Sequence, residues 1–209
     1  MTELRIRPAG DRALLLEPPD LDAPAALAGR LRERPVDGVA DILPAARTVL
    51  VTLRPGTDPA AVAQVLREAA ASAPRGGDGD RGEPIVIPVH YDGADLTDAA
   101  RLLGISVPEL IARHTGCEWH CAFVGFAPGF GYLEAPRANL TVPRRDQSRT
   151  AVPAGSVALA GGYSAVYPRR SPGGWQLIGR ADTVLWDLTR PDPALLRPGS
   201  RVRFTVAGR

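Results

Sequence analysis

The alternation of apolar and polar side chains predicts short strands in the first part of the chain, with helical segments between them. Strand-like alternation covers three segments, residues 4–7, 13–17 and 48–53. Two segments have the Ala, Leu and Arg content of helices, residues 23–34 and 59–71. Asp58 stands where it can cap the second helix, and Pro59 occupies the first helical position, where proline is tolerated.

The order of these segments, β-β-α-β-α, predicts a small α+β domain of ferredoxin-like type. It is followed by Ser72 to Glu83, a segment dense in Gly, Pro and Asp that has the composition of a linker. We therefore predict a domain boundary at residue 82, which separates an N-terminal domain over 1–82 from a second domain over 83–209.

The second domain is predicted to be rich in strands. Apolar or alternating runs cover six segments, residues 84–91, 156–160, 163–167, 174–179, 183–187 and 201–206, and strand character also begins at Trp119. Gly161 and Gly162 separate two of these runs and are typical of a two-residue hairpin. Many short strands joined by turn residues favour a closed or nearly closed barrel.

Two short helices are predicted after the first of these strands. Thr97 is expected to cap the first helix, and Gly104 to end it. Ser106 and Glu109 have the spacing of a capping box at the start of the second helix, which Gly116 closes.

Composition narrows the class of protein. The chain has 209 residues, 44% of them hydrophobic, and a net charge of +2, which is typical of a globular protein and gives no sign of nucleic-acid binding. With no apolar run of about 18 residues, no signal-like N-terminus and two cysteines, we expect a cytoplasmic protein. All 25 basic residues are arginine, so this chain has no Walker-type phosphate loop, Schiff-base lysine or biotinylated lysine.

Four residues of metal-binding type lie close together: His114, Cys117, His120 and Cys121. A structural zinc site normally takes ligand pairs from separate segments, and in a strand His120 and Cys121 point to opposite faces, so we predict no metal. His114 follows Leu110 at helical spacing. It is therefore either a buried imidazolium favoured by the helix C-terminus or a general base or substrate ligand.

Further candidates lie in three segments rich in glycine and proline, 125–133, 152–156 and 171–175, and the first and third also carry aromatic residues. Such segments form either rigid loops that plug a barrel or the wall of a ligand pocket. The middle segment is also suited to present backbone N–H groups and the Ser156 hydroxyl to an oxyanion. Arg144, Arg145 and Arg149 lie between these segments and are suited to clamp a carboxylate or a phosphate, although a solvated arginine is the commoner case.

Taken in order, these segments resemble one family. The motifs that carry the resemblance are Tyr91-Asp-Gly-Ala-Asp-Leu96, His114, Gly125 to Leu133, Pro143-Arg144, Arg149 to Ser156, Tyr167-Pro168 and Ser171 to Gly179. In this order they resemble the B subunit of 5-oxoprolinase, a family also named KipI and allophanate hydrolase subunit 1. The chain departs from the family's pattern at Gly162 to Ala165, where relatives commonly read Asn-Gln-Thr-Gly, and at Ser148, where they commonly read proline.

The resemblance implies a ferredoxin-like N-terminal domain and a cyclophilin-like β-barrel in the second domain. It implies one member of a multi-protein, ATP-dependent hydrolase that converts 5-oxo-L-proline to L-glutamate, with ATP as co-substrate bound here or on a partner. The implied partners are the homologous C subunit, of the allophanate hydrolase subunit 2 type, and a third oxoprolinase subunit. The implied catalytic residues are His114, Arg149 and Ser156. The implied substrate pocket is formed by Phe126, Pro128, Phe130, Tyr132, Arg144 and Tyr167, with Trp175 at its rim.

Other functions remain open from the sequence. Family members named KipI inhibit a sensor histidine kinase, a role that requires an exposed docking surface. A carboxyltransferase component acting on urea-derived substrates is a further alternative and would need a biotin carrier on another protein. Prolyl isomerisation rests on analogy with the cyclophilin-like barrel alone.

Overall fold

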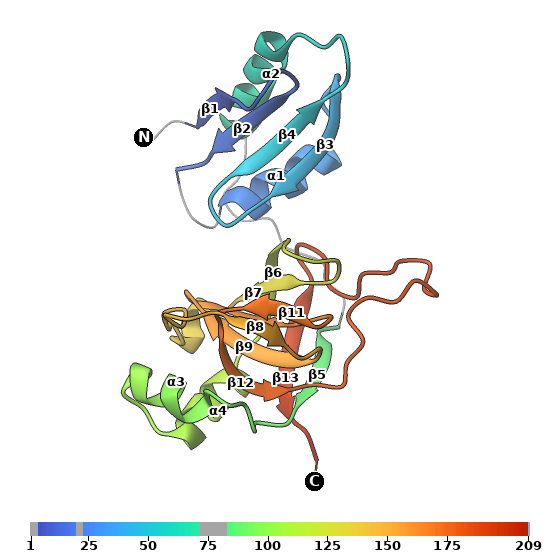
Figure 1. Cartoon of the computed structure of the whole chain (residues 1–209). Coiled ribbons are helices and arrows are strands. Elements are labelled where there is room, and N and C mark those ends of the chain that lie inside the picture. The colour runs from blue at the N-terminus through green and yellow to red at the C-terminus, as the bar shows by residue number, and fades with distance from the viewer. Residues whose placement is uncertain (1–3, 20–22, 72–82, 209) are drawn as a thin grey trace. The chain divides into compact units, whose positions relative to one another are not determined.

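The computed structural model describes residues 4–19, 23–71 and 83–208. The chain divides into two compact units, Met1–Gly79 and Asp80–Arg209 (Figure 1). The predicted linker lies outside the described residues, except for Glu83. Each unit has its own apolar core.

The N-terminal unit is a four-stranded antiparallel sheet with two helices. Its elements are β1 (Arg5–Pro8), β2 (Ala13–Glu17), α1 (Ala23–Glu33), β3 (Val39–Pro44), β4 (Val49–Leu53) and α2 (Pro59–Ala71), and the sheet order is β1-β2-β4-β3. Alternate residues of the two central strands, among them Leu16 and Val51, are fully buried under the helices. The carboxylate of Asp58 accepts a hydrogen bond of 2.9 Å from the N–H of Ala60, which confirms the predicted cap of α2.

Strand β3 was not predicted from the sequence. It lies at the edge of the sheet, exposes Ala40 and Asp41 and ends at Pro44, so its apolar alternation is weak. With this strand the chain order becomes β-β-α-β-β-α, whereas a ferredoxin-like domain reads β-α-β-β-α-β. The α+β class is therefore confirmed, and the ferredoxin-like assignment of this unit is not.

The C-terminal unit is built on a seven-stranded sheet with the order β12-β9-β10-β7-β6-β13-β5, beside a two-stranded sheet of β8 and β11. Its strands are β5 (Ile85–Val89), β6 (Trp119–Val124), β7 (Gly131–Glu134), β8 (Arg149–Val152), β9 (Ser156–Ala160), β10 (Tyr163–Val166), β11 (Ser171–Gly173), β12 (Gln176–Arg180) and β13 (Arg201–Val206). Its helices are α3 (Leu96–Leu103), α4 (Val107–Thr115) and the 3-10 helix η1 (Pro136–Ala138).

The seven-stranded sheet is a nearly closed barrel, as predicted. Strand β5 pairs in parallel with β13 at one edge of the sheet. Just beyond β5, the backbone of His90 exchanges hydrogen bonds of 2.8 and 2.9 Å with Arg180 at the end of β12, the other edge. The predicted hairpin is also confirmed, because Gly161 and Gly162 both have positive φ and join the antiparallel strands β9 and β10.

Gly93 brings the segment before α3 against the barrel. Its N–H donates to the carbonyl of Ile178, 3.3 Å away, and an added methyl group would collide with the backbone of Ile178 and Gly179. Two residues later, the N–H of Asp95 donates to the carbonyl of Leu177 at 2.9 Å. Only glycine allows this approach, and it places Asp95 over strand β12.

The two helices begin and end mostly as predicted. Gly104 ends α3 in the left-handed conformation, and the Ser106 hydroxyl accepts a hydrogen bond of 3.3 Å from the N–H of Glu109 at the start of α4. The predicted cap at Thr97 is wrong. The residue before α3 is Asp95, and its carboxylate makes no capping bond because other groups bind it.

The predicted strand over 183–187 is also wrong. This segment belongs to the long connection between β12 and β13, which the structure shows as an extended arm with one isolated bridge, between Trp186 and Ala194. Within the described residues, no helix has both the length and the apolar character needed to cross a bilayer.

Candidate functional site

A buried carboxylate connects three segments of the C-terminal unit. The side chain of Asp95 is 3% exposed, and its two oxygens accept hydrogen bonds of 2.8 Å from Arg149. The same carboxylate accepts a hydrogen bond of 2.5 Å from Arg145 and one of 2.8 Å from the N–H of Leu177. It therefore holds the start of α3, the loop that precedes β8, and strand β12 together.

Ionisation of Asp95 is favoured despite its burial. Burial acts to raise the pKa of this carboxyl. The hydrogen bonds from Arg149 and the Leu177 N–H, together with the charges of Arg149 and Arg145, outweigh that effect and hold the pKa of Asp95 below its ordinary value. Arg149, predicted from the family as catalytic, is thus engaged in a bidentate ion pair with a buried partner.

An aromatic cluster is a second feature of the C-terminal unit. The ring of Phe130 is at its centre, with edge-to-face contacts to Tyr132, Tyr167 and Trp175 at centroid distances of 5.1, 5.3 and 5.7 Å. Phe126 adds a further edge-to-face contact to Phe130 at 5.2 Å. Five of the predicted pocket residues are thus brought into one cluster.

The members of this cluster differ in exposure. Phe126 is 57% exposed and Pro128 is also exposed, whereas Phe130, Tyr167 and Trp175 are buried. The predicted position of Trp175 at a rim is therefore wrong, because this indole is 4% exposed. The buried rings form the base of an aromatic surface, and Phe126 and Pro128 form its outer edge.

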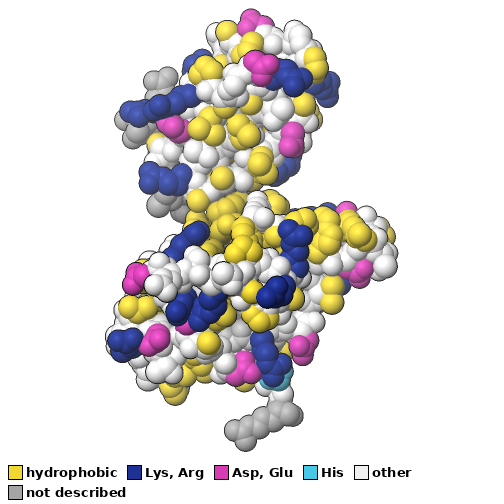
Figure 2. Space-filling model, viewed as in Figure 1, with side chains coloured by type: hydrophobic (Ala, Val, Ile, Leu, Met, Phe, Trp, Pro, Cys, Tyr) yellow, Lys and Arg dark blue, Asp and Glu magenta, His cyan; other side chains and the backbone are white. Residues whose placement is uncertain are grey.

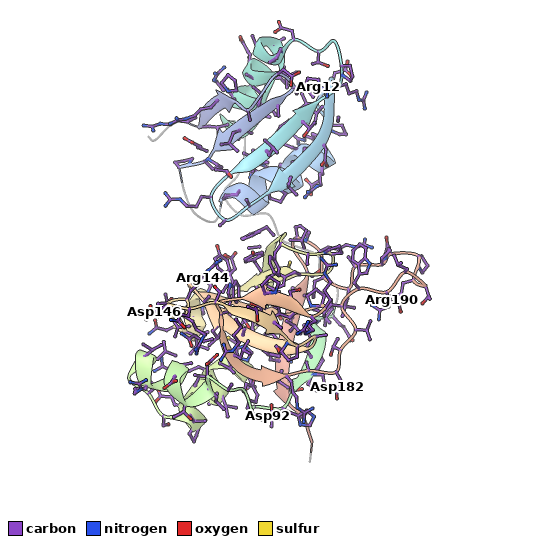
Figure 3. All side chains as sticks on the ribbon, in the orientation of Figure 1. Arg12, Asp92, Arg144, Asp146, Asp182 and Arg190 are labelled. Carbon is purple, nitrogen blue, oxygen red and sulfur yellow. The ribbon has the colours of Figure 1, made fainter. Side chains whose placement is uncertain are left out.

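Arg144 lies near enough to this cluster for its charge to act on two of the phenols. The pKa values of the Tyr132 and Tyr167 phenols are raised by burial, and the nearby positive charge of Arg144 lowers both by less. Arg144 is exposed and has no ion-pair or hydrogen-bond partner among the described residues. Figure 3 shows its side chain beside Asp146, and Figure 2 shows further arginines on the face of this unit that carries β8 and β11. Arg144 is thus free to bind an anion next to flat apolar rings.

Ser156 lies at the start of β9 and is 6% exposed. The turn before it uses its own N–H groups, since Gly155 donates to the carbonyl of Tyr167 at 2.8 Å and Ser156 donates to that of Pro153 at 3.4 Å. The expected oxyanion donors are therefore bound within the chain. The catalytic role of Ser156 stays a prediction that this geometry does not support.

His114 is fully buried in the core of the C-terminal unit. Hydrogen bonds of 2.7 and 2.8 Å join its Nδ1 to the Tyr91 hydroxyl and its Nε2 to the Ser164 hydroxyl, and its ring stacks on Phe204 at a centroid distance of 4.2 Å. Burial lowers the pKa of His114 to about 3, so the ring is neutral and not the imidazolium considered from the sequence. This environment favours a structural role for His114.

The segment that departs from the family's pattern is part of this core. Ser164 supplies the hydroxyl that binds His114, and it is completely buried. The ring of Tyr163 packs edge-to-face on Phe123 and Tyr132. In this chain the segment therefore supports both His114 and the aromatic cluster.

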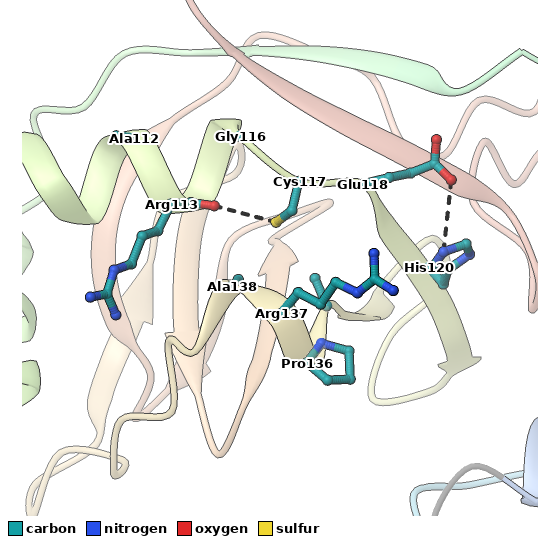
Figure 4. A pocket seen from close by; sticks show the side chains of 10 residues that line it. Ala112, Arg113, Gly116, Cys117, Glu118, His120, Pro136, Arg137 and Ala138 are labelled. Carbon is teal, nitrogen blue, oxygen red and sulfur yellow. Dashed lines mark hydrogen bonds and ion pairs between the residues drawn. The ribbon is translucent and has the colours of Figure 1, made fainter.

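A pocket of about 840 Å³ is lined by other residues of this unit (Figure 4). Its lining comes from the end of α4, the start of β6 and helix η1, and it includes Arg113, Cys117, His120 and Arg137. None of the predicted site residues lines it. The Cys117 thiol donates to the carbonyl of Arg113 at 3.3 Å, and His120 points outward while Cys121 is buried, as expected for a strand.

The sequence did not single out Asp95. Its position immediately before a helix is typical of a capping residue, so the sequence gives no reason to expect an ion pair there. The only signal was its place in the motif from Tyr91 to Leu96, since two arginines more than 45 residues away give no periodic pattern.

Comparison with known proteins supplies further evidence. A family model described as the carboxyltransferase domain, subdomain C and D, matches residues 4–196. The B subunit of 5-oxoprolinase from Escherichia coli O157:H7 is 39% identical over 210 residues, which cover 93% of this chain and 92% of that protein.

Two solved structures have the same fold. The crystal structure of TTHA0988 matches 95% of this chain with a TM-score of 0.77 and 34% identity. This chain covers 41% of that protein, about two fifths of its length. The urea carboxylase of Kluyveromyces lactis matches 98% of this chain with a TM-score of 0.76, over 22% of its own chain. At 19% identity this second likeness shows the fold alone.

Proposed function

The chain belongs to the family of the 5-oxoprolinase B subunit, and we propose that it is the corresponding component of an ATP-dependent hydrolase that converts 5-oxo-L-proline to L-glutamate. The observation that carries this proposal is the 39% identity to the Escherichia coli protein over nearly the full length of both chains. The match covers 93% of this chain and 92% of the relative.

The aromatic surface and Arg144 support a role in holding the substrate. 5-Oxoproline has one carboxylate and a flat five-membered lactam ring. A free guanidinium is suited to pair with the carboxylate, and aromatic faces are suited to pack against the ring. In this proposal Arg144 binds the carboxylate, and Phe126, Pro128, Phe130 and Tyr132 contact the ring, with Tyr167 and Trp175 supporting them.

The reaction needs ATP because an unactivated lactam is a poor electrophile. Overall, one 5-oxoproline, one ATP and two waters give glutamate, ADP and phosphate, and the bond that breaks in the ring is the amide C–N bond. Without lysine, this chain has no Walker-type loop, so the nucleotide is held by a partner protein or by arginines and backbone N–H groups. The homologous C subunit and a third oxoprolinase subunit are the proposed partners.

The test is reconstitution of ATP-dependent glutamate release with and without this chain. Release that depends on the chain would support the proposal. Release that is the same without it would overturn the proposal and favour the kinase-inhibitor and urea-derived alternatives.

A further inference from the structure

The arm between β12 and β13, residues 184–195, projects from the barrel (Figure 1). Its outgoing and returning segments are joined by backbone hydrogen bonds of 2.9 Å, from the N–H of Asp187 to the carbonyl of Pro193 and from the N–H of Leu195 to the carbonyl of Leu185. Leu185 is 2% exposed and packs in the core of the C-terminal unit, so the base of the arm is anchored. Backbone pairing and this buried leucine therefore define the conformation of the arm.

Large apolar side chains alternate along the outer side of the arm. Val184, Trp186 and Leu188 are 54%, 39% and 78% exposed. The two residues that alternate with them point elsewhere. Leu185 is buried, and the carboxylate of Asp187 accepts a hydrogen bond within the arm. Figure 2 shows hydrophobic side chains gathered over the arm. A row of exposed apolar residues on an ordered extended segment is typical of a contact surface.

The charges of the arm are neutralised within the chain. Arg190 lies 3.4 Å from the carboxylate of Asp187, and Arg197 lies 2.5 Å from that of Asp192. The carboxylate of Asp187 also accepts bonds of 2.9 and 2.7 Å from the N–H and hydroxyl of Thr189. A partner of this surface therefore meets apolar side chains and little unpaired charge.

The apolar row continues onto the loop that carries Phe126. A methyl group added at Gly129 would lie 3.0 Å from Cβ of Trp186, so the loop and the arm are in contact. Phe126 is 57% exposed and has a φ of 68°, a left-handed conformation that costs free energy for a residue with a side chain. Two exposed aromatic residues from distant parts of the sequence thus lie on loops that contact each other.

We propose that the apolar row of the arm, Val184, Trp186 and Leu188, is the docking surface for the homologous C subunit of the hydrolase complex. This inference rests on the proposed function. A relative of nearly the same length is named as one subunit of an enzyme, which implies that this relative binds another chain. The TTHA0988 chain is more than twice as long as the part of it that matches here. The partner is expected to offer an apolar groove, because the charges of the arm are already paired.

The test is titration calorimetry of this chain with the C subunit. Leu188→Ser and Trp186→Ser each remove an exposed apolar group, and each is expected to raise Kd about tenfold or more. Leu102→Ser, which changes a 51% exposed leucine on α3, is the matched control and is expected to leave Kd within about twofold. Because apolar contact is not screened, raising the salt from about 0.1 M to about 1 M should change Kd little.

Thermal melting controls for folding, and exposed positions should leave the melting temperature unchanged. Arm variants that bind the C subunit like the wild type, or a wild type that does not bind it, would overturn the proposal. So would a wild-type dimer that Leu188→Ser dissociates, since the occupant would then be a second copy of this chain.

Turnover separates this proposal from the proposed function. Leu188→Ser should raise the concentration of chain that gives half-maximal glutamate release and leave the maximal rate unchanged. Binding without any turnover would overturn the proposed function and leave the docking surface standing. If Leu188→Ser supports turnover with the same half-maximal concentration of chain as the wild type, the proposed docking surface is overturned and the proposed function stands.

Discussion

The guanidinium of Arg149 donates one hydrogen bond to each oxygen of the Asp95 carboxylate, with N–O distances of 2.8 Å. The pair joins residues 54 positions apart in the sequence. It ties the start of β8, which follows the loop that carries Arg144, to the segment before α3, so the position of the candidate anion-binding residue depends on this ion pair.

Asp95→Asn should destabilise the C-terminal unit by about 2 kcal/mol at neutral pH, because an amide cannot accept the four charged and backbone hydrogen bonds that the carboxylate accepts. Urea unfolding of the two proteins measures this difference. Equal free energies of unfolding, within about 0.5 kcal/mol, would show that the pair is energetically neutral.

The same comparison has a predicted pH dependence. The folded-state pKa of Asp95 lies below its unfolded value of 3.8, so its contribution is fully present above that value and is lost as the pH falls through the lower folded value. The difference in free energy of unfolding between wild type and Asp95→Asn should therefore be constant near neutral pH and shrink below about pH 4. A difference that grows in acid would contradict the ion pair.

Arg144→Ala and Arg149→Ala should have different effects. Arg144 has no partner among the described residues, so its removal should leave stability within about 0.5 kcal/mol and raise KM for 5-oxoproline by about tenfold to hundredfold. Arg149→Ala leaves Asp95 with only part of its hydrogen bonds and should cost about 2 kcal/mol of stability. Unfolding curves and steady-state kinetics on both variants distinguish a binding residue from a supporting one. Exposed Arg169→Ala is the control.

His114 should stay neutral across the physiological range. The unfolded chain protonates this histidine below about pH 6.5 and the folded chain only near pH 3, so stability should fall as the pH drops between these values. His114→Gln should remove that slope, whereas the exposed control His120→Gln should retain it. An NMR titration that shows His114 protonating near pH 6 would contradict this assignment and restore its candidacy as a general base.

Gly93→Ala should prevent closure of the barrel. The added methyl group would collide with backbone of β12, which cannot move without breaking sheet pairing, so we expect a loss of about 3 kcal/mol or more. Gly125→Ala is the control, because its nearest new contact is the Tyr132 ring at 3.8 Å. Thermal unfolding that is the same for both variants would contradict the close approach of the segment before α3.

Sequence patterns correctly predicted the elements that are determined by residues close together in the sequence. Strand β13 was expected over 201–206 and forms over those residues, and the Gly161-Gly162 turn specified its own hairpin. The edge strand β3 was not predicted, and residues 183–187 were wrongly predicted as a strand. In both segments, which side chains are exposed depends on where the segment packs, and the local pattern does not show this. The apolar alternation of Val184, Trp186 and Leu188 is real, but these side chains point outward from an arm.

The site was predicted in part for the same reason. Phe126, Phe130 and Tyr132 lie within one short motif, so their clustering was accessible from the sequence. The partner of Arg149 was not, since Asp95 reaches it only through the closure of the barrel. The burial of His114 against Phe204 likewise arises from a strand that lies 90 residues further along the chain.

The most direct test of the account is glutamate release from 5-oxoproline by the reconstituted complex, with this chain, without it, and with Arg144→Ala in its place. The account predicts ATP-dependent release with the wild type, none when the chain is omitted, and a raised KM with Arg144→Ala. Release that proceeds equally without the chain would contradict its assignment as a working component of the hydrolase.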